Sequence, residues 1–424
     1  MRRNRAAQLL VLMAVATAGL VHERDARADL GLSAQGSFTG DGASAYFGYA
    51  VAVDANTTVV GAMNDGGNGA AYVYVRSPGW TLQQKLTASD GAANDQFGYA
   101  VALSGNTLLV GAAGRTSGQG AVYAFTRTGS TWTQKQEITE GTGGQPNDCF
   151  GCALALSGAT AVIGAPGASA ATGGAFVYKQ ASTLTWSQQS QFLGGAVGDS
   201  FGFSVALNPS ANVMAVGAFG SSSQRGSVYV FSQSGTTWTQ PQAPLTASDG
   251  VAGDSFGYAL GLEAGALLVG AYRAGGPGAA YVFGQTGAGW SQQQKLVPTD
   301  PTGSDDYGAS VALNGTTALV GAFEHGGNAG SVYLYSRGSS GFALSDELNA
   351  PSSPESFAYA VAYSGTTVAI GAPSLSNNSG GATFYVLEGG SPVPAVGDRG
   401  ASGLLLLLGI AGVAACRRRG GEAS

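Results

Sequence analysis

The chain is built from short stretches in which every second residue is large and apolar. In "FGYAVALSGNTLLVGAAG", which begins the second of several similar stretches, these residues are Phe97, Tyr99, Val101 and Leu103. Glycine or alanine fills the positions between them. An alternation with period two predicts a β-strand. Because one face of this strand is bulky and the other nearly bare, we expect sheets stacked so that each bulky face meets a bare one.

Three more strands are predicted in the same unit. A "Ser-Gly-Asn" turn leads into "TLLVGAAG", a glycine-rich turn leads into "GAVYAFTR", and "Thr-Gly-Ser" leads into "TWTQKQEIT". No stretch with helical period separates these strands, which excludes a parallel sheet made of βαβ units. The unit is therefore predicted to be a four-stranded antiparallel sheet.

This unit recurs seven times along the chain. Its first marker is an aromatic residue followed by a small one, at Phe47-Gly48, Phe97-Gly98, Phe150-Gly151, Phe201-Gly202, Phe256-Gly257, Tyr307-Gly308 and Phe357-Ala358. Its second marker is Gly-Ala, at Gly61-Ala62, Gly111-Ala112, Gly164-Ala165, Gly217-Ala218, Gly270-Ala271, Gly321-Ala322 and Gly371-Ala372. Successive first markers lie 50 to 55 residues apart. Seven four-stranded units with this period predict an all-β fold, a seven-bladed β-propeller.

The ends of the repeat region indicate how the ring closes. The fourth strand contains an aromatic residue in six units, at Trp80, Trp132, Trp186, Trp238, Trp290 and Phe342. The seventh unit stops at "ATFYVLEGG" and has no such strand. Residues 29–38 precede the first unit at the position of a fourth strand. We therefore expect them to supply the outer strand of the last blade, which removes an open sheet edge and gives a propeller of residues 29–388.

The two markers resemble the FG-GAP repeat of integrin α-subunit propellers and their bacterial relatives. Pro166 and Pro373 complete the "GAP" triplet in two units. The resemblance covers about residues 30–388 and implies a seven-bladed propeller used for binding or adhesion outside the cell.

One departure from that family concerns metal binding. Integrin-type repeats often carry a calcium loop, Asp-x-Asp-x-Asp-Gly-x-x-Asp, between the markers. Here the turn reads "DANT", "SGNT", "SGAT", "EAGA", "NGTT" or "SGTT", and only Asp54 and Asn56 resemble the start of such a loop. Calcium needs six or more oxygen ligands, so we expect no metal site and no cofactor.

Both ends of the chain are predicted to direct export. Residues 1–28 have a basic start, an apolar run and an Ala-Arg-Ala site, which predicts a signal peptide cleaved between Ala28 and Asp29. Residues 389–402 form a Gly/Pro linker. Residues 403–424 are a short apolar run with an arginine tail, and they resemble the C-terminal sorting signals of bacterial surface proteins, such as the PEP-CTERM type; a simple tail anchor is the alternative. The expected location is the cell surface or the extracellular space.

Charge and cysteines limit the partners further. Residues 29–398 retain 10 of the 19 Lys and Arg residues and 22 of the 25 Asp and Glu residues, a formal charge of −12. A body so poor in cations is not expected to bind nucleic acid. Cys149 and Cys152 form a C-x-x-C pair at the start of a strand, where a redox motif would instead begin a helix. A local disulfide or two packed thiols are the expected states.

The repeated polar and aromatic residues each allow two interpretations. An acidic residue stands two positions before the first marker in six units, at Asp95, Asp148, Asp199, Asp254, Asp305 and Glu355. These carboxylates form either a ring of cation or sugar ligands or caps for their own turns. Trp80, Trp132, Trp186, Trp238 and Trp290 are candidates for stacking on sugars, or they pack neighbouring blades together. His325 stands where the first unit has Asp65 and is expected to be a turn residue.

No catalytic set is recognisable, because nucleophile–histidine–acid sets, H-E-x-x-H and phosphate-binding loops are all missing from the sequence. The protein is predicted not to be an enzyme. The leading hypothesis is a monomeric, surface-displayed propeller that binds a protein or matrix partner and contacts the membrane only through its C-terminal tail. The alternatives are a glycan-binding, lectin-like propeller and a secreted polysaccharide-cleaving enzyme with paired carboxylates.

Overall fold

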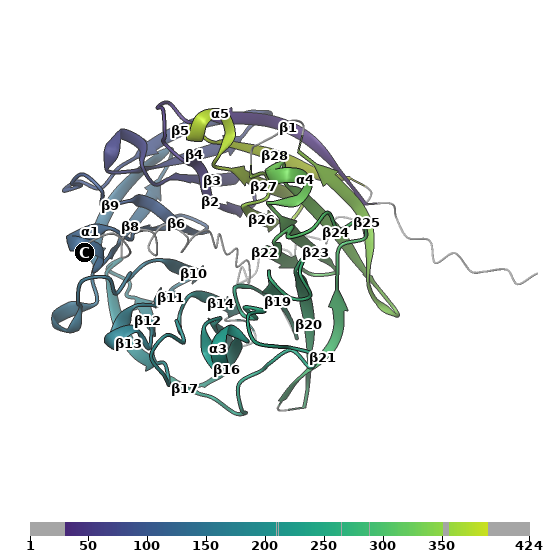
Figure 1. The fold of residues 1–424 in the computed structure, drawn as a ribbon. Coiled ribbons are helices and arrows are strands. Elements are labelled where there is room, and N and C mark those ends of the chain that lie inside the picture. Colours follow the sequence, from purple (N-terminus) through teal and green to yellow (C-terminus); the bar gives the residue numbers. More distant parts are fainter. Residues whose placement is uncertain are drawn as a thin grey trace, which may run out of the picture.

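The chain folds into a ring of seven antiparallel sheets, each of four strands, around one axis (Figure 1). This arrangement is seen in a computed structural model that describes residues 30–388 except 209, 211, 264, 288 and 351–355. The prediction of an all-β, seven-bladed propeller is confirmed. The first strand of each unit lies nearest the axis and the fourth lies at the rim (Figure 1).

Six blades are continuous in sequence, and their strands are hydrogen-bonded in chain order. The first three blades are β2 (Phe47–Asp54), β3 (Thr57–Ala62), β4 (Ala70–Arg76) and β5 (Trp80–Leu86); β6 (Phe97–Ser104), β7 (Thr107–Ala112), β8 (Ala121–Thr128) and β9 (Thr131–Ile138); and β10 (Ala153–Ser157), β11 (Thr160–Ala165), β12 (Gly174–Gln180) and β13 (Trp186–Leu193). The next three are β14 (Ser204–Asn208), β15 (Val213–Ala218), β16 (Ser227–Ser234) and β17 (Thr237–Thr239); β18 (Ala259–Glu263), β19 (Ala266–Ala271), β20 (Ala279–Thr286) and β21 (Gly289–Leu296); and β22 (Tyr307–Asn314), β23 (Thr317–Ala322), β24 (Ser331–Gly338) and β25 (Gly341–Asn349).

Blade 7 joins the two ends of the described chain. It contains β26 (Ala360–Ser364), β27 (Thr367–Ala372), β28 (Gly381–Glu388) and β1 (Gly31–Thr39). Strand β1 pairs antiparallel with β28 and lies beside it at the rim in Figure 1. The prediction that the N-terminal segment supplies the missing outer strand is confirmed.

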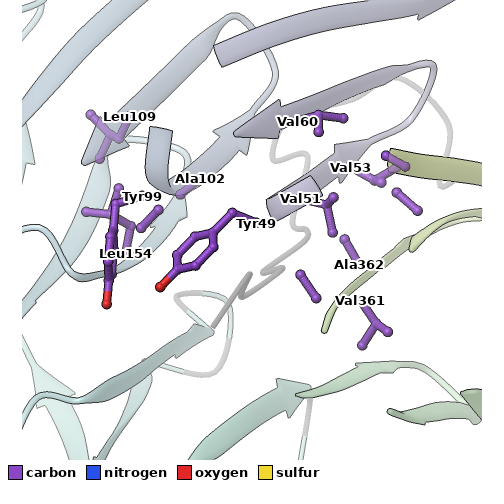
Figure 2. Close-up of a cluster of buried hydrophobic side chains, with 14 of the residues drawn as sticks. Tyr49, Val51, Val53, Val60, Tyr99, Ala102, Leu109, Leu154, Val361 and Ala362 are labelled. Carbon is purple, nitrogen blue, oxygen red and sulfur yellow. The ribbon is translucent and has the colours of Figure 1, made fainter. Parts of the chain in front are cut away.

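The alternation of bulky and bare faces explains how the blades stack. Ala50 and Ala52, on the bare face of β2, belong to one buried cluster with Val101 and Leu103 of the next blade. At the other side of blade 1, Val51 lies close to Ala362 of blade 7 (Figure 2). Small side chains let the twisted sheets approach closely, and the large ones of the neighbour fill the space, as close-packed interiors require.

The two glycines of the repeat meet across the blade interfaces. A Cβ atom on Gly61 would lie 2.0 Å from the carbonyl oxygen of Gly98 in the next blade, and the same approach closes the ring between Gly371 and Gly48. Gly98 itself has φ +91°, a conformation that side chains disfavour. The repeated motif therefore marks the points where one backbone touches the next.

Short helical turns follow the second strand of most blades. They are η1 (Asp65–Gly67), α1 (Arg115–Gly118), α2 (Ala168–Ala171), α3 (Ser221–Gln224), α4 (His325–Asn328) and α5 (Leu375–Asn378), and a further turn, η2 (Gly141–Gly143), lies between blades 2 and 3. In the part of the chain that the structure describes, no helix is long and apolar enough to cross a membrane.

Candidate functional site

The antiparallel order divides the loops between two ends of the ring. Segments that link the outer strand of one blade to the inner strand of the next lie at the same end as the helical turns. We call this end the connector face; its linking segments are residues 40–46, 87–96, 139–152, 194–203, 240–258, 297–306 and the described part of 350–359. The tight hairpins lie at the opposite end.

The hairpin end is where the resemblance would place calcium loops. The turn between β2 and β3 contains only residues 55 and 56, which is too short to wrap around a cation with six oxygens. Asp54 accepts a hydrogen bond from the Gly105 backbone N–H in the next blade. Its carboxylate thus joins neighbouring turns, and burial raises its pKa.

The carboxylates before the first marker cap the linking segments. In each case a carboxylate oxygen accepts the backbone N–H of the residue three positions earlier: Asp95 from Ala92, Asp148 from Gln145, Asp199 from Ala196, Asp254 from Val251 and Asp305 from Thr302. This geometry matches the turn-capping interpretation. Glu355 lies outside the described residues.

The tryptophans are buried between blades. Trp80, Trp132, Trp186, Trp238 and Trp290 are each at most 8% exposed. Trp80 of blade 1 packs edge-on against Phe384 of blade 7, with ring centroids 4.9 Å apart. A residue that stacks on a sugar must expose a ring face, and these residues do not, so their geometry matches the packing interpretation.

Glutamines on or just after the outer strands bridge neighbouring blades. The side chain of a glutamine in one blade hydrogen-bonds both backbone polar groups of the aromatic residue at or next to the start of the outer strand in the next blade. The pairs are Gln84 with Trp132, Gln136 with Trp186, Gln242 with Trp290 and Gln294 with Phe342. We call these contacts glutamine bridges. Their sequence signal is a glutamine four residues after the tryptophan.

Cys149 and Cys152 are joined by a disulfide. The bond links the residues immediately before and immediately after the first marker of blade 3. Both residues are buried, at 7% and 6% exposure. The disulfide is thus a local link beside an inner strand.

Aromatic rings converge near the axis on the connector face. Residues two positions after Phe or Tyr of the first marker supply them, and the ring of Tyr49 lies 5.0 Å from that of Tyr99 and 5.2 Å from that of Tyr359. Burial, with Tyr359, Tyr272 and Tyr99 nearby, raises the pKa of Tyr258 well above its usual value. The axis is therefore packed with aromatic side chains from several blades at this end.

Near the rim of the connector face, polar side chains form what we call rim clusters. In blade 1, Lys85 lies 2.7 Å from Asp65 and 3.4 Å from Asp41. In blade 5, Lys295 lies 2.6 Å from Asp249. Each cluster ties a linking segment to the outer strand of its blade.

Among the residues that the structure describes, blade 2 holds the largest of these ion-pair networks. Arg115 pairs with Asp90, with Asp95 at 3.1 Å and with Glu137 at 3.2 Å. Tyr123 donates its hydroxyl to Asp90 at 2.9 Å. One arginine thus pairs with three carboxylates that come from two linking positions and the outer strand.

The same face exposes large apolar side chains. Val197, Val251 and Val297 lie on the linking segments into three successive blades and are 76%, 62% and 50% exposed. Leu193, at the end of β13, is 48% exposed. Of the six large apolar side chains that are exposed in the described part of the chain, these four lie at this end of the ring.

Comparison with known families accounts for this architecture. The FG-GAP repeat model matches residues 39–74, 80–125, 132–178, 186–231, 238–283 and 290–335, more than half of the chain. The protein belongs to the FG-GAP repeat family. Each match to the FG-GAP model begins at or near an outer strand and ends in the third strand of the following blade. No curated protein matches the chain significantly.

Neither the FG-GAP matches nor the described residues reach the two ends of the chain. The predicted cleavage site at Ala28 and Asp29, and the predicted linker and sorting signal at 389–424, lie outside the described residues.

Proposed function

We propose that this protein is an exported, surface-displayed, non-catalytic propeller that binds a protein or matrix partner through its connector face. The FG-GAP propeller fold is compatible with binding and adhesion. We choose the connector face because it exposes four apolar residues: Leu193, Val197, Val251 and Val297. They lie on consecutive blades of a rigid ring, where several weak contacts can engage one partner together.

The structural roles of the repeated polar and aromatic residues support binding over catalysis. The repeated carboxylates are used to cap turns, and the tryptophans are used to pack blades. The varied residues lie in loops that a rigid scaffold positions, which is where binding proteins place their contacts. A glycan-binding role would need another surface than the tryptophan faces.

The test is binding of the purified protein to an array of matrix proteins and glycans, with and without EDTA. We expect saturable binding to protein spots that weakens at least tenfold in the double variant Val197→Ser/Val251→Ser. The matched control is Leu184→Ser, because Leu184 is also exposed but lies in a hairpin at the opposite end. Binding to glycan spots alone, or equal loss in the control, would reject the proposed function.

A further inference from the structure

Blade 6 repeats the rim cluster of blade 2 with one substitution. The linking-segment aspartates, the tyrosine and the outer-strand glutamate are the same in both blades: Asp90, Asp95, Tyr123 and Glu137 correspond to Asp300, Asp305, Tyr333 and Glu347. Each tyrosine faces its glutamate across the strand pair. Arg115, the first residue of α1, is replaced by His325, the first residue of α4.

The substitution removes the guanidinium that pairs with three carboxylates in blade 2. Tyr333 donates its hydroxyl to Asp300 at 2.8 Å, as Tyr123 does to Asp90. Among the described residues, no lysine or arginine forms a salt bridge with the carboxylates of Asp300, Asp305 or Glu347; His325 lies within ion-pair distance of Asp300 and Asp305. Three carboxylates therefore converge on one imidazole, where blade 2 has a guanidinium.

The imidazole of His325 is oriented like a metal ligand. His325 is 7% exposed. Its Nδ1 is buried without a hydrogen bond and lies 3.4 Å from Oδ1 of Asp305. Its Nε2 lies 3.5 Å from Oδ2 of Asp300. A histidine that directs one ring nitrogen at a buried carboxylate and the other at the ligand group is the usual arrangement around protein-bound zinc.

Three ligand atoms lie close enough to share one ion. One ligand atom from each of Asp300, His325 and Glu347 lies within 4.8 Å of the other two. Zinc bonds of about 2.0–2.2 Å bring such atoms to roughly 3.5 Å from each other, so binding would draw the three side chains closer together. Oε1 of Glu347 is buried and has no hydrogen-bond partner. Asp300 is half-exposed, which gives an ion a path from solvent.

We propose that blade 6 binds a zinc ion through His325 Nε2 and the carboxylates of Asp300 and Glu347, with Asp305 as the positioning residue for the imidazole. One imidazole and two carboxylates suit zinc, and water would complete a four-coordinate site. The ion would join the linking segment to strand β25, as Arg115 joins the corresponding elements of blade 2. The site is at the opposite end of the blade from the hairpins that hold calcium in integrin-type repeats, and it is independent of the proposed binding partner.

The experiment is a calorimetric titration of the chelator-treated full protein with zinc chloride. We expect one equivalent of zinc to bind and the melting temperature to rise with it. His325→Arg should abolish this binding while the protein stays folded, because blade 2 accommodates arginine at the same position. Asp305→Asn should weaken binding about 10- to 100-fold. Asp249→Asn, in the rim cluster of blade 5, is the matched control and should bind like the wild type.

The reciprocal variant makes the test sharper. Arg115→His gives blade 2 the full residue set of blade 6, so we expect two equivalents of zinc to bind. Calcium chloride should not compete, since calcium prefers sites made only of oxygen. No saturable zinc binding by the folded wild type, or undiminished binding by His325→Arg, would overturn the proposal. A second equivalent in Arg115→His would confirm that the shared residues form the site.

Discussion

Gln84 of blade 1 hydrogen-bonds both backbone polar groups of Trp132 in blade 2. Its Oε1 accepts the Trp132 N–H at 2.8 Å, and its Nε2 donates to the Trp132 carbonyl at 3.0 Å. The amide side chain thus acts as a substitute strand partner at the rim, where the two outer strands belong to separate sheets. The same glutamine bridge occurs at three other interfaces, so the outer ring is held by a repeated polar contact as well as by packing.

Loss of one glutamine bridge should destabilise the ring moderately. Gln84→Ala removes two partly buried hydrogen bonds and leaves both backbone groups of Trp132 without this partner. We expect the free energy of unfolding to fall by about 1–2 kcal/mol, measured by denaturant titration. The matched control is Ser190→Ala, since Ser190 occupies the equivalent position of blade 3. Equal effects in the two variants would contradict the role of the bridge.

A methyl group at the second-marker glycine should be far more harmful. A Cβ atom on Gly111 would lie 2.1 Å from the carbonyl oxygen of Gly151 in the next blade, and backbone cannot move aside locally. We expect Gly111→Ala to cost about 3 kcal/mol or more, measured as a fall in melting temperature. Gly338→Ala is the control, because a Cβ atom there meets nothing within 4 Å. A melting temperature like that of the control would show that the interface is loose.

Removal of the N-terminal strand should open the ring. Deletion of residues 29–40 takes away β1 and leaves β28 as an unpaired edge. It also removes Phe38, whose ring lies 4.9 Å from that of Phe384 and 4.4 Å from that of Tyr74 in blade 1. We expect a large fall in melting temperature and concentration-dependent aggregation, measured by calorimetry and light scattering.

A point variant separates packing from strand pairing in that experiment. Phe38→Ala keeps the backbone ladder of β1 and removes only the aromatic contacts. It should cost roughly 2–3 kcal/mol without aggregation. A deletion variant as stable and soluble as the wild type would contradict ring closure through β1.

Glu140 should make stability depend on pH. Burial, with Asp148 nearby, raises the pKa of Glu140 to about 7, and its Oε2 is buried without a hydrogen bond. The folded protein therefore holds this proton more tightly than the unfolded chain does. Its contribution to stability is fully present below the unfolded pKa of 4.5 and is lost as the pH rises toward 7.

The neutral analogue isolates this effect. We expect Glu140→Gln to melt at a higher temperature than the wild type at about pH 8 and at the same temperature at about pH 4. The comparison at low pH is the internal control, since the wild-type side chain is then mostly neutral in both states. An equal difference at the two pH values would show that the glutamine acts through packing or hydrogen bonding alone.

Local patterns in the sequence determine the number of blades, the strands within them and the closing strand. Period-two alternation and the two markers can each be read within a single unit. Residues 29–38 can be matched to the missing fourth strand of the seventh unit by their position in the repeat. The strand boundaries of blade 4 are less regular because Pro241 and Pro244 interrupt its outer strand, which resumes only where Leu245 bridges Val228.

Tertiary structure alone decides what the repeated residues contact. The reason for the two glycines, the target of Gln84 and the convergence of His325 with Asp300 and Glu347 all depend on distances between strands that are separate in sequence. Comparison of the repeats shows that His325 occupies the position of Asp65 in the equivalent turn of blade 1. It does not reveal which carboxylates surround the imidazole. Blade geometry supplies that information, because the twist of each sheet and the contact between neighbours set which rim side chains meet.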